Sequence, residues 1–226
     1  MMTGTARVLL FDLDGTLTDN YLGISRSIVY ALEQLDASVP DAATLRRCVG
    51  PPLRESFRWL LDTDDATLVE QAIGLYRMRF ADVGWRENVV YDGIADAFAA
   101  LATGTTRMFV CTSKPEVYAR RIVTLFGFLE HLDGVYGVDL PGRLDDKVKL
   151  LAHLVATEHL DPAHAIMIGD RAHDIRAARM NGMRCAGVLW GYGSREELAA
   201  ADALVTAPSE LPQVLAAMAA QNPRSR

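Results

Sequence analysis

The chain has 226 residues, of which 50% are hydrophobic and 23% are charged, and its formal net charge is −6. This composition is typical of a globular domain with a sizeable core and excludes a disordered or membrane-embedded chain. The apolar runs are shorter than the roughly 20 residues that a membrane-spanning helix needs, and lysines and arginines do not gather with aromatic residues into a nucleic-acid-binding face. We therefore expect a protein with no membrane partner and no nucleic-acid partner.

Short apolar runs alternate with helical patterns along most of the chain. Runs of this length, bounded by turn residues, are typical of buried parallel strands. The alternation predicts a layered α/β domain with right-handed crossovers. The expected strands are Val8–Leu13, Met108–Thr112, Gly134–Val138, Ala165–Gly169, Cys185–Trp190 and, with a weaker pattern, Ala203–Thr206.

The connection between the first two expected strands is too long for a simple crossover. It contains three helical patterns, Leu22–Ala37, Leu53–Leu61 and Thr67–Phe80, and no strand pattern. We therefore predict a helical cap inserted at residues 18–90, with an α/β core formed by residues 1–17 and 91–226. The first helix of that core would be Asp92–Leu101.

The three cysteines, Cys48, Cys111 and Cys185, are widely spaced and form no CxxC pair. This pattern argues against a disulfide framework or a zinc cluster. We interpret the cysteines as small buried residues and expect a cytoplasmic location.

Polar side chains follow the expected strands at the points where those strands end. Ligands of an open parallel sheet bind outside the carboxyl ends of its strands, so these side chains should converge on one crevice. The residues are Asp12, Asp14, Gly15, Thr112, Ser113 and Asp170, and Lys147 opens the helix that follows the third strand.

This set of residues suits phosphoryl transfer. A carboxylate such as Asp12 can attack phosphorus and form an aspartyl-phosphate, which divides one difficult step into two. Mg²⁺ prefers a few carboxylate oxygens, which Asp12 and Asp170 can supply, and it would reduce the repulsion between the two anions. Asp14 can protonate the leaving oxygen and later deprotonate water. Gly15 permits a tight turn that brings backbone amides to the phosphate.

The motifs FDLDGT, CTSKP and IGDRAHDI, with Lys147 between the last two, resemble the four motifs of the haloacid dehalogenase superfamily. The segments VGPPLRESF, VYDGI, GVYGVDLPGR and GVLWGYGSREEL are similar to its phosphoglycolate-phosphatase-like members with a helical cap. The resemblance implies a Rossmann-like three-layer core and hydrolysis of a small phosphorylated metabolite such as phosphoglycolate.

The resemblance also implies a role for each residue of the motifs. Asp12 is the nucleophile, and Asp14 is the acid/base that also offers Mg²⁺ its backbone carbonyl. Asp170 is a metal ligand, and Asp174 supports the metal waters or Lys147. Gly15, Thr112, Ser113 and Lys147 bind the phosphate.

Several of these residues have simpler interpretations. Asp174 can cap a helix. Lys149, two residues beyond Lys147, is an alternative candidate for the phosphate-binding lysine. We expect Lys114 to be a solvated neighbour of the site. Arg171 and His173 can line the pocket or lie on the surface. The loop around Gly50 is expected to face the crevice but offers few charged groups.

Other functions share the same motifs. A phosphosugar mutase returns the phosphate to its substrate, and a 5'-nucleotidase hydrolyses nucleoside monophosphates. Haloacid dehalogenation is disfavoured by Asp14, because relatives with that chemistry lack an acid there. A non-enzymatic alternative is a metal-binding phospho-receiver, which needs no acid for a leaving group. We expect either a monomer or a homodimer.

Overall fold

The computed structural model describes residues 8–102, 105–139, 144 and 146–220. The described residues up to Thr18 and from Val90 onward form one compact unit, and Asp19–Val89 form a second. The sequence prediction places the cap at residues 18–90. The strands β2 (Thr18–Asp19) and β3 (Val89–Val90) form a separate two-stranded sheet, and the boundary between the units passes through both.

The first unit contains a six-stranded parallel sheet in the order β5-β4-β1-β6-β7-β8. The strand β1 lies near the middle, with Phe11 in register with Val110 on one side and Ile168 on the other. The chain order of the strands reverses beside β1, which is where ligands bind in such sheets. The strands are β1 (Val8–Phe11), β4 (Arg107–Pro115), β5 (Gly134–Val138), β6 (Ala165–Gly169), β7 (Arg184–Val188) and β8 (Ala203–Val205).

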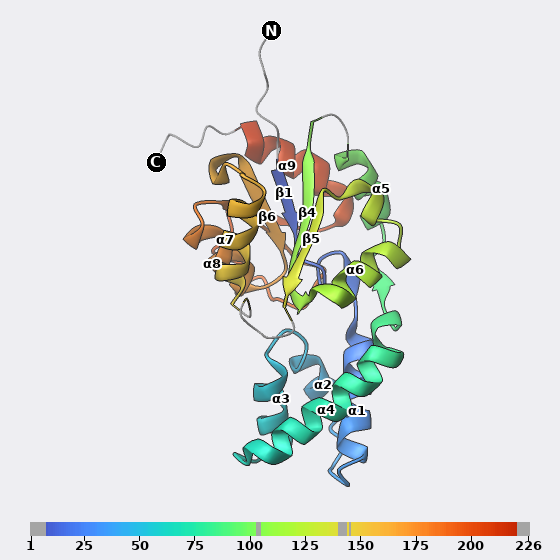
Figure 1. The fold of residues 1–226 in the computed structure, drawn as a ribbon. Coiled ribbons are helices and arrows are strands. Elements are labelled where there is room, and N and C mark those ends of the chain that lie inside the picture. The colour runs from blue at the N-terminus through green and yellow to red at the C-terminus, as the bar shows by residue number, and fades with distance from the viewer. Residues whose placement is uncertain (1–7, 103–104, 140–143, 145, 221–226) are drawn as a thin grey trace. The chain divides into compact units, whose positions relative to one another are not determined.

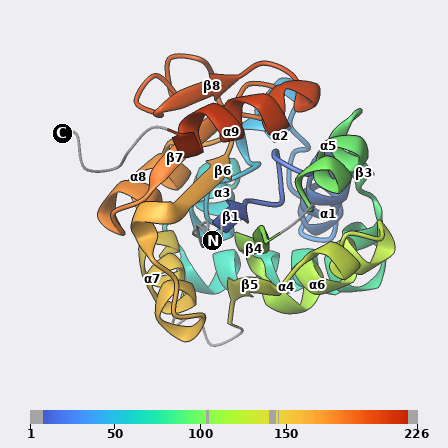
Figure 2. The same ribbon diagram turned by 90° about the horizontal axis from the view of Figure 1, so that it is seen from above.

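Helices cover both faces of this sheet (Figures 1 and 2), which makes three layers and confirms the predicted α/β fold class. On one face lie α7 (Lys147–Thr157) and α8 (Ala172–Met180). On the other face lie α5 (Ile94–Leu101), α6 (Glu116–Leu125) and α9 (Leu211–Ala220). Short 3₁₀ helices occur at Leu129–His131, Pro162–His164 and Pro208–Glu210.

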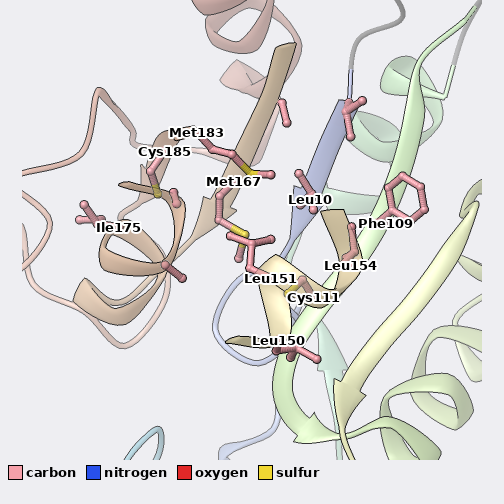
Figure 3. Packing of buried hydrophobic residues seen from close by; sticks show 14 of the residues in the cluster. Leu10, Phe109, Cys111, Leu150, Leu151, Leu154, Met167, Ile175, Met183 and Cys185 are labelled. Atoms are coloured by element: carbon pink, nitrogen blue, oxygen red, sulfur yellow. The ribbon is translucent and has the colours of Figure 1, made fainter. Parts of the chain in front are cut away.

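The sheet is held by apolar side chains on both faces. Figure 3 shows Leu10, Phe109 and Met167 of three neighbouring strands packed toward Leu154 of α7. Full burial of each such side chain stabilises the fold by about 1.5–3 kcal/mol. On the opposite face the rings of Phe11 and Phe98 lie 5.1 Å apart between centroids. The loops at the strand ends therefore rest on a rigid frame.

The observed strands differ from the predicted ones mainly at their ends. The first strand stops at Phe11, because Leu13 turns the chain and its carbonyl accepts bonds from the N–H groups of Leu17 and Thr18. The strand β4 runs on to Pro115, with an irregularity in its register after Thr112. These ends carry the polar side chains of interest.

The second unit consists of helices. They are α1 (Tyr21–Glu33), α2 (Ala42–Arg47), α3 (Leu53–Leu60), α4 (Ala66–Asp82) and a 3₁₀ turn at Gly84–Arg86. The helix α2 is not predicted by the sequence pattern, because it is too short to show a helical period; its start is marked by the Asp41 side chain, which accepts Thr44 N–H. Throughout the described ranges, each helix lacks the combined length and apolarity needed to cross a membrane.

The core of the helical unit is aromatic and aliphatic. The rings of Tyr76 and Phe80 stack 5.5 Å apart between centroids, and Phe57 meets Tyr76 edge-on. Arg79 of α4 forms an ion pair with Glu87 at 2.8 Å, and Arg26 of α1 contacts the same carboxylate at 2.7 Å. Glu87 therefore links the two long helices of the unit.

Candidate active site

Asp12 follows β1 directly and is buried. Its backbone N–H donates to Ile168 O at 2.8 Å, which holds it in line with the strand. Its Oδ1 accepts Leu13 N–H at 2.7 Å, and its Oδ2 lies 2.9 Å from Lys147 Nζ. Burial acts to raise the pKa of Asp12, but the charges of Lys147 and His173 and the hydrogen bonds from Lys147 and the Leu13 N–H together hold the pKa below its usual value. Asp12 is therefore an ionised carboxylate.

Lys147 is the first residue of α7, and its ammonium pairs with two carboxylates. The Asp146 side chain caps the helix and so fixes where it begins. Lys147 Nζ contacts both Asp12 Oδ2 and Asp174 Oδ1. Burial opposes the charged ammonium, but the two carboxylates raise the pKa of Lys147 above its usual value. Lys149 is exposed, so the lysine that meets the acids is Lys147.

Lys114 is buried, which corrects the expectation of a solvated neighbour. Its side chain is 5% exposed, and its Nζ lies 2.7 Å from Asp14 Oδ2. Because β4 continues to Pro115, Lys114 belongs to the strand, and its N–H lies 3.3 Å from Thr112 Oγ1. Ser113, between them, is exposed. A second lysine thus joins the predicted acids, whereas the Ser113 side chain stays at the surface.

Asp170 follows β6 and is fully buried. Its Oδ2 accepts Tyr192 N–H at 2.8 Å, and its Oδ1 lies 3.4 Å from Thr16 Oγ1. Burial and the charges of Asp12 and Asp174 raise the pKa of Asp170 to about 8. The repulsion from Asp12 and Asp174 therefore raises the pKa of Asp170 by more than the attraction of Lys147 lowers it.

Gly15 brings the first loop against Asp170. Its φ is +84°, in the left-handed region that glycine adopts readily. A Cβ at this position would collide with the Asp170 carboxylate. The sequence predicts a tight turn at Gly15. Because Gly15 also has no side chain, there is room for Asp170, a candidate metal ligand, beside the loop that carries Asp12.

Asp174 caps α8 and also contacts Lys147. Its Oδ2 accepts Arg171 N–H at 3.0 Å and so caps α8, while its Oδ1 contacts Lys147. Arg171 points its guanidinium to Glu197, with Nε 2.8 Å from Oε1. His173 is partly exposed, with Nε2 3.8 Å from Asp174 Oδ1. Burial lowers the pKa of His173 below its usual value, against the pull of Asp174.

Among the described residues, the side chains of Asp12, His173 and Asp174 could together hold a metal ion, because their ligand atoms lie within 4.8 Å of one another. The Lys147 ammonium already contacts both of those carboxylates. In the predicted set of Asp12, Asp14 and Asp170, the Asp170 carboxylate meets two uncharged donors, the Tyr192 N–H and the Thr16 hydroxyl.

The sequence analysis singled out no role for the residues that follow β7. Trp190 Nε1 donates to Thr16 O at 3.0 Å, and Tyr192 N–H holds Asp170. Glu197 accepts both Arg171 Nε–H and Ala172 N–H. The available signal was the alternation of aromatic residues and glycines in WGYG, because glycines next to bulky residues indicate a close approach of backbones.

The parallel sheet, the acids beside β1 and the inserted helices are the features of one class of hydrolase. A family model described as haloacid dehalogenase-like hydrolase matches residues 9–188, which include these features. The chain belongs to this family.

Individual relatives within the family carry different names. The chain is 44% identical over 192 residues to a 5'-nucleotidase of Pseudomonas aeruginosa, which covers 85% of this chain and 86% of the relative. It is 39% identical over 187 residues to the tyrosine-protein kinase PtkA of Mycobacterium tuberculosis, covering 83% of this chain and 63% of that protein. A phosphoglycolate phosphatase of Cupriavidus necator is 29% identical over 215 residues, 92% of each chain.

The fold is also similar to solved structures. A predicted phosphatase from Clostridium acetobutylicum superposes with a TM-score of 0.87 at 36% identity, over 95% of this chain and 100% of that one. This likeness supports the arrangement of sheet and helices described above.

Proposed function

We propose that the chain is a magnesium-dependent phosphomonoester hydrolase that acts on a small phosphorylated metabolite through an aspartyl-phosphate on Asp12. The observation that carries the proposal is the pairing of Asp12 with Lys147. The ammonium keeps the buried carboxylate ionised and occupies its Oδ2 at 2.9 Å. An ionised, fixed carboxylate at a strand end is the nucleophile that this chemistry needs.

The other residues would share the remaining work. Lys147 and Thr112 Oγ1 would bind the non-bridging phosphate oxygens, and Gly15, whose N–H donates to Thr18 O at 2.8 Å, would shape the turn beside them. Ser113 would contribute its backbone N–H, because its side chain is exposed. Asp14 would give a proton to the leaving oxygen and then take one from the water that attacks the aspartyl-phosphate.

We propose that Mg²⁺ is held by carboxylate oxygens of Asp12 and Asp170 and by the backbone carbonyl of Asp14. The residues fit the ion, because hard oxygen donors are what Mg²⁺ prefers. The raised pKa of Asp170, caused by burial and neighbouring acids, also indicates negative charge that a cation would relieve. When bound, the ion would neutralise charge between the phosphate and the nucleophile. Asp174 would support Lys147.

We further propose that the helical unit, residues 18–90 of the prediction, is a cap that selects the substrate and that the other unit carries the chemistry. In haloacid dehalogenase-like enzymes with an inserted helical cap, which this chain resembles, substrate choice is associated with the cap. The free, buried thiols of Cys48, Cys111 and Cys185 support a cytoplasmic location.

Two substrate classes deserve direct comparison. Phosphoglycolate follows from the motif resemblance, whereas a nucleoside 5'-monophosphate is favoured by the 44% identity to a 5'-nucleotidase over 85% of this chain. The 39% identity to a protein named a tyrosine-protein kinase raises the question of which group accepts the phosphoryl group from the aspartyl-phosphate. The aspartyl-phosphate could pass its phosphoryl group to water or to a phenolic hydroxyl.

The test is phosphate release by the purified chain from phosphoglycolate, a set of nucleoside 5'-monophosphates and several sugar phosphates. Each substrate is measured with Mg²⁺ and again with excess chelator, beside an Asp12→Asn control. We expect Mg²⁺-dependent release that the control lacks. Full activity in chelator would contradict the metal assignment. Transfer to a tyrosine peptide without phosphate release would contradict hydrolysis.

A further inference from the structure

The segment Trp190–Gly193 touches both loops that carry the proposed metal ligands. The Trp190 indole N–H donates to Thr16 O at 3.0 Å, in the loop that begins with Asp12 and Asp14. The Tyr192 backbone N–H donates to Asp170 Oδ2 at 2.8 Å. These two bonds join residues that lie 174 and 22 positions apart in the chain.

The two glycines of the segment allow its backbone to lie against Asp170. A Cβ on Gly191 would collide with Gly15 O and with Asp170 Cβ, closer than real Cβ atoms come to such atoms. A Cβ on Gly193 would collide with Asp170 O. Three stretches of backbone therefore meet around one carboxylate, and only glycine fits between them.

The residues that follow the segment are also anchored beside Asp170. Glu197 Oε1 accepts Ala172 N–H at 2.9 Å and Arg171 Nε–H at 2.8 Å. Glu197 N–H in turn lies 3.2 Å from Ser194 Oγ. Because Arg171 follows Asp170 directly, the residues after the segment are also tied to the loop that carries the carboxylate.

We propose that Trp190–Gly193 is a positioning segment that sets the affinity of the site for a divalent cation by fixing the Asp170 carboxylate. The Tyr192 N–H donates to one lone pair of Asp170 Oδ2. Because Gly191 has no Cβ, the Asp170 carboxylate has room to lie beside it. Partners that orient a metal ligand typically change affinity about 10- to 100-fold when removed. The inference rests on the proposed assignment of Asp170 as a ligand.

The experiment measures Mg²⁺ and Mn²⁺ dissociation constants of the metal-free protein by titration calorimetry, without substrate. Gly191→Ala is compared with Gly74→Ala, where a Cβ would meet nothing within 4 Å. Trp190→Phe keeps an aromatic six-membered ring and removes the pyrrole ring with its N–H, and Trp59→Phe, at an exposed position of α3, is its control. Circular dichroism in chelator reports whether each variant is folded.

We expect Gly191→Ala to weaken metal binding about 10- to 100-fold and Trp190→Phe to weaken it about tenfold. Both controls should bind as the wild type does. Wild-type affinity in folded Gly191→Ala, or in Trp190→Phe if the glycine variant does not fold, would overturn the inference. If the wild type itself bound no divalent cation, the metal assignment of the proposed function would fail, and the inference with it.

Discussion

Lys114 Nζ lies 2.7 Å from Asp14 Oδ2, and the lysine side chain is 5% exposed. A buried ion pair of this kind fixes the direction of the carboxylate, because charge-assisted hydrogen bonds are short and directional. The pair places an ammonium group against the second carboxylate of the first motif, as Lys147 does for Asp12. Lys114 is therefore a candidate for orienting the proposed acid/base.

The first prediction concerns this pair. Lys114→Met should lower kcat about 10- to 100-fold, because a hydrogen bond to a charged group contributes about 1.5–3 kcal/mol and each 1.36 kcal/mol is tenfold in rate. The control is Lys149→Met, which removes an exposed lysine of α7. Steady-state kinetics on an alkyl phosphate provides the measurement. Unchanged kcat in Lys114→Met would make the pair a structural feature only.

The second prediction concerns the nucleophile. Asp12→Asn should lower turnover by at least about a thousandfold, because an amide does not accept the phosphoryl group. The fold should remain, since Lys147 keeps its contact with Asp174 and the backbone bond to Ile168 O is unchanged. Acid-quenched protein should contain trapped phosphoenzyme in the wild type and none in the variant. Asp64→Asn, at an exposed loop position, is the matched control.

The sequence predicted the sheet well because buried parallel strands are continuous apolar runs. Gly134–Val138 and Ala165–Gly169 have the predicted bounds, and the acids at strand ends converge because all six strands are parallel. Asp12 and Lys147, distant in the sequence, meet for this reason.

Other features depend on tertiary contacts that leave little trace in local sequence. Lys114 is buried because β4 runs past Thr112, and a lysine near a turn is ordinarily solvated. The bond from Trp190 to Thr16 O joins residues 174 positions apart. The helix α2 has only six residues, too few for an apolar period to be visible.

The third prediction concerns the helical unit and pH. Hydrogen bonding to Arg79 and Arg26 holds the pKa of Glu87 below its usual range. Because the pKa is lower in the folded state, the stabilisation is present above the unfolded value of about 4.3 and is lost as the pH falls through the folded value. Glu87→Gln should therefore destabilise the protein at pH 7 and have a much smaller effect at pH 3.

The expected size follows from the geometry. Glu87 and Arg79 are 15% and 18% exposed, so we expect a loss of roughly 1–2 kcal/mol. For a chain of this length, that loss corresponds to a fall of about 2–8 °C in Tm. Thermal unfolding followed by circular dichroism at both pH values is the measurement. Glu55→Gln, on the exposed face of α3, should change Tm little at either pH. An equal effect of Glu87→Gln at both pH values would show that its charge is unimportant.

The fourth prediction concerns Asp14, whose two proposed jobs fall in different half-reactions. In the first it protonates the departing alkoxide, and in the second it deprotonates the attacking water. Assistance of this kind is typically worth about 10²- to 10⁴-fold. Asp14→Asn should therefore lose that factor on an alkyl phosphate such as phosphoglycolate. The loss of the partner also leaves Lys114 buried beside a neutral amide, so Asp14→Asn/Lys114→Met is measured in parallel.

A substrate with a good leaving group separates the two jobs. With p-nitrophenyl phosphate the leaving oxygen needs little protonation, so the first step of Asp14→Asn should remain fast while the second becomes slow. Rapid-quench measurements should then show a burst of nitrophenol and a larger steady-state fraction of phosphoenzyme than the wild type holds. The backbone carbonyl of residue 14 is unchanged, so the Mg²⁺ dissociation constant should stay close to that of the wild type.

Equal losses on both substrates, with neither burst nor phosphoenzyme, would remove Asp14 from acid–base catalysis. If the double variant recovered the burst that the single variant lacked, the charge of Lys114 beside the neutral amide would be the cause, and Asp14 would act mainly by neutralising that charge.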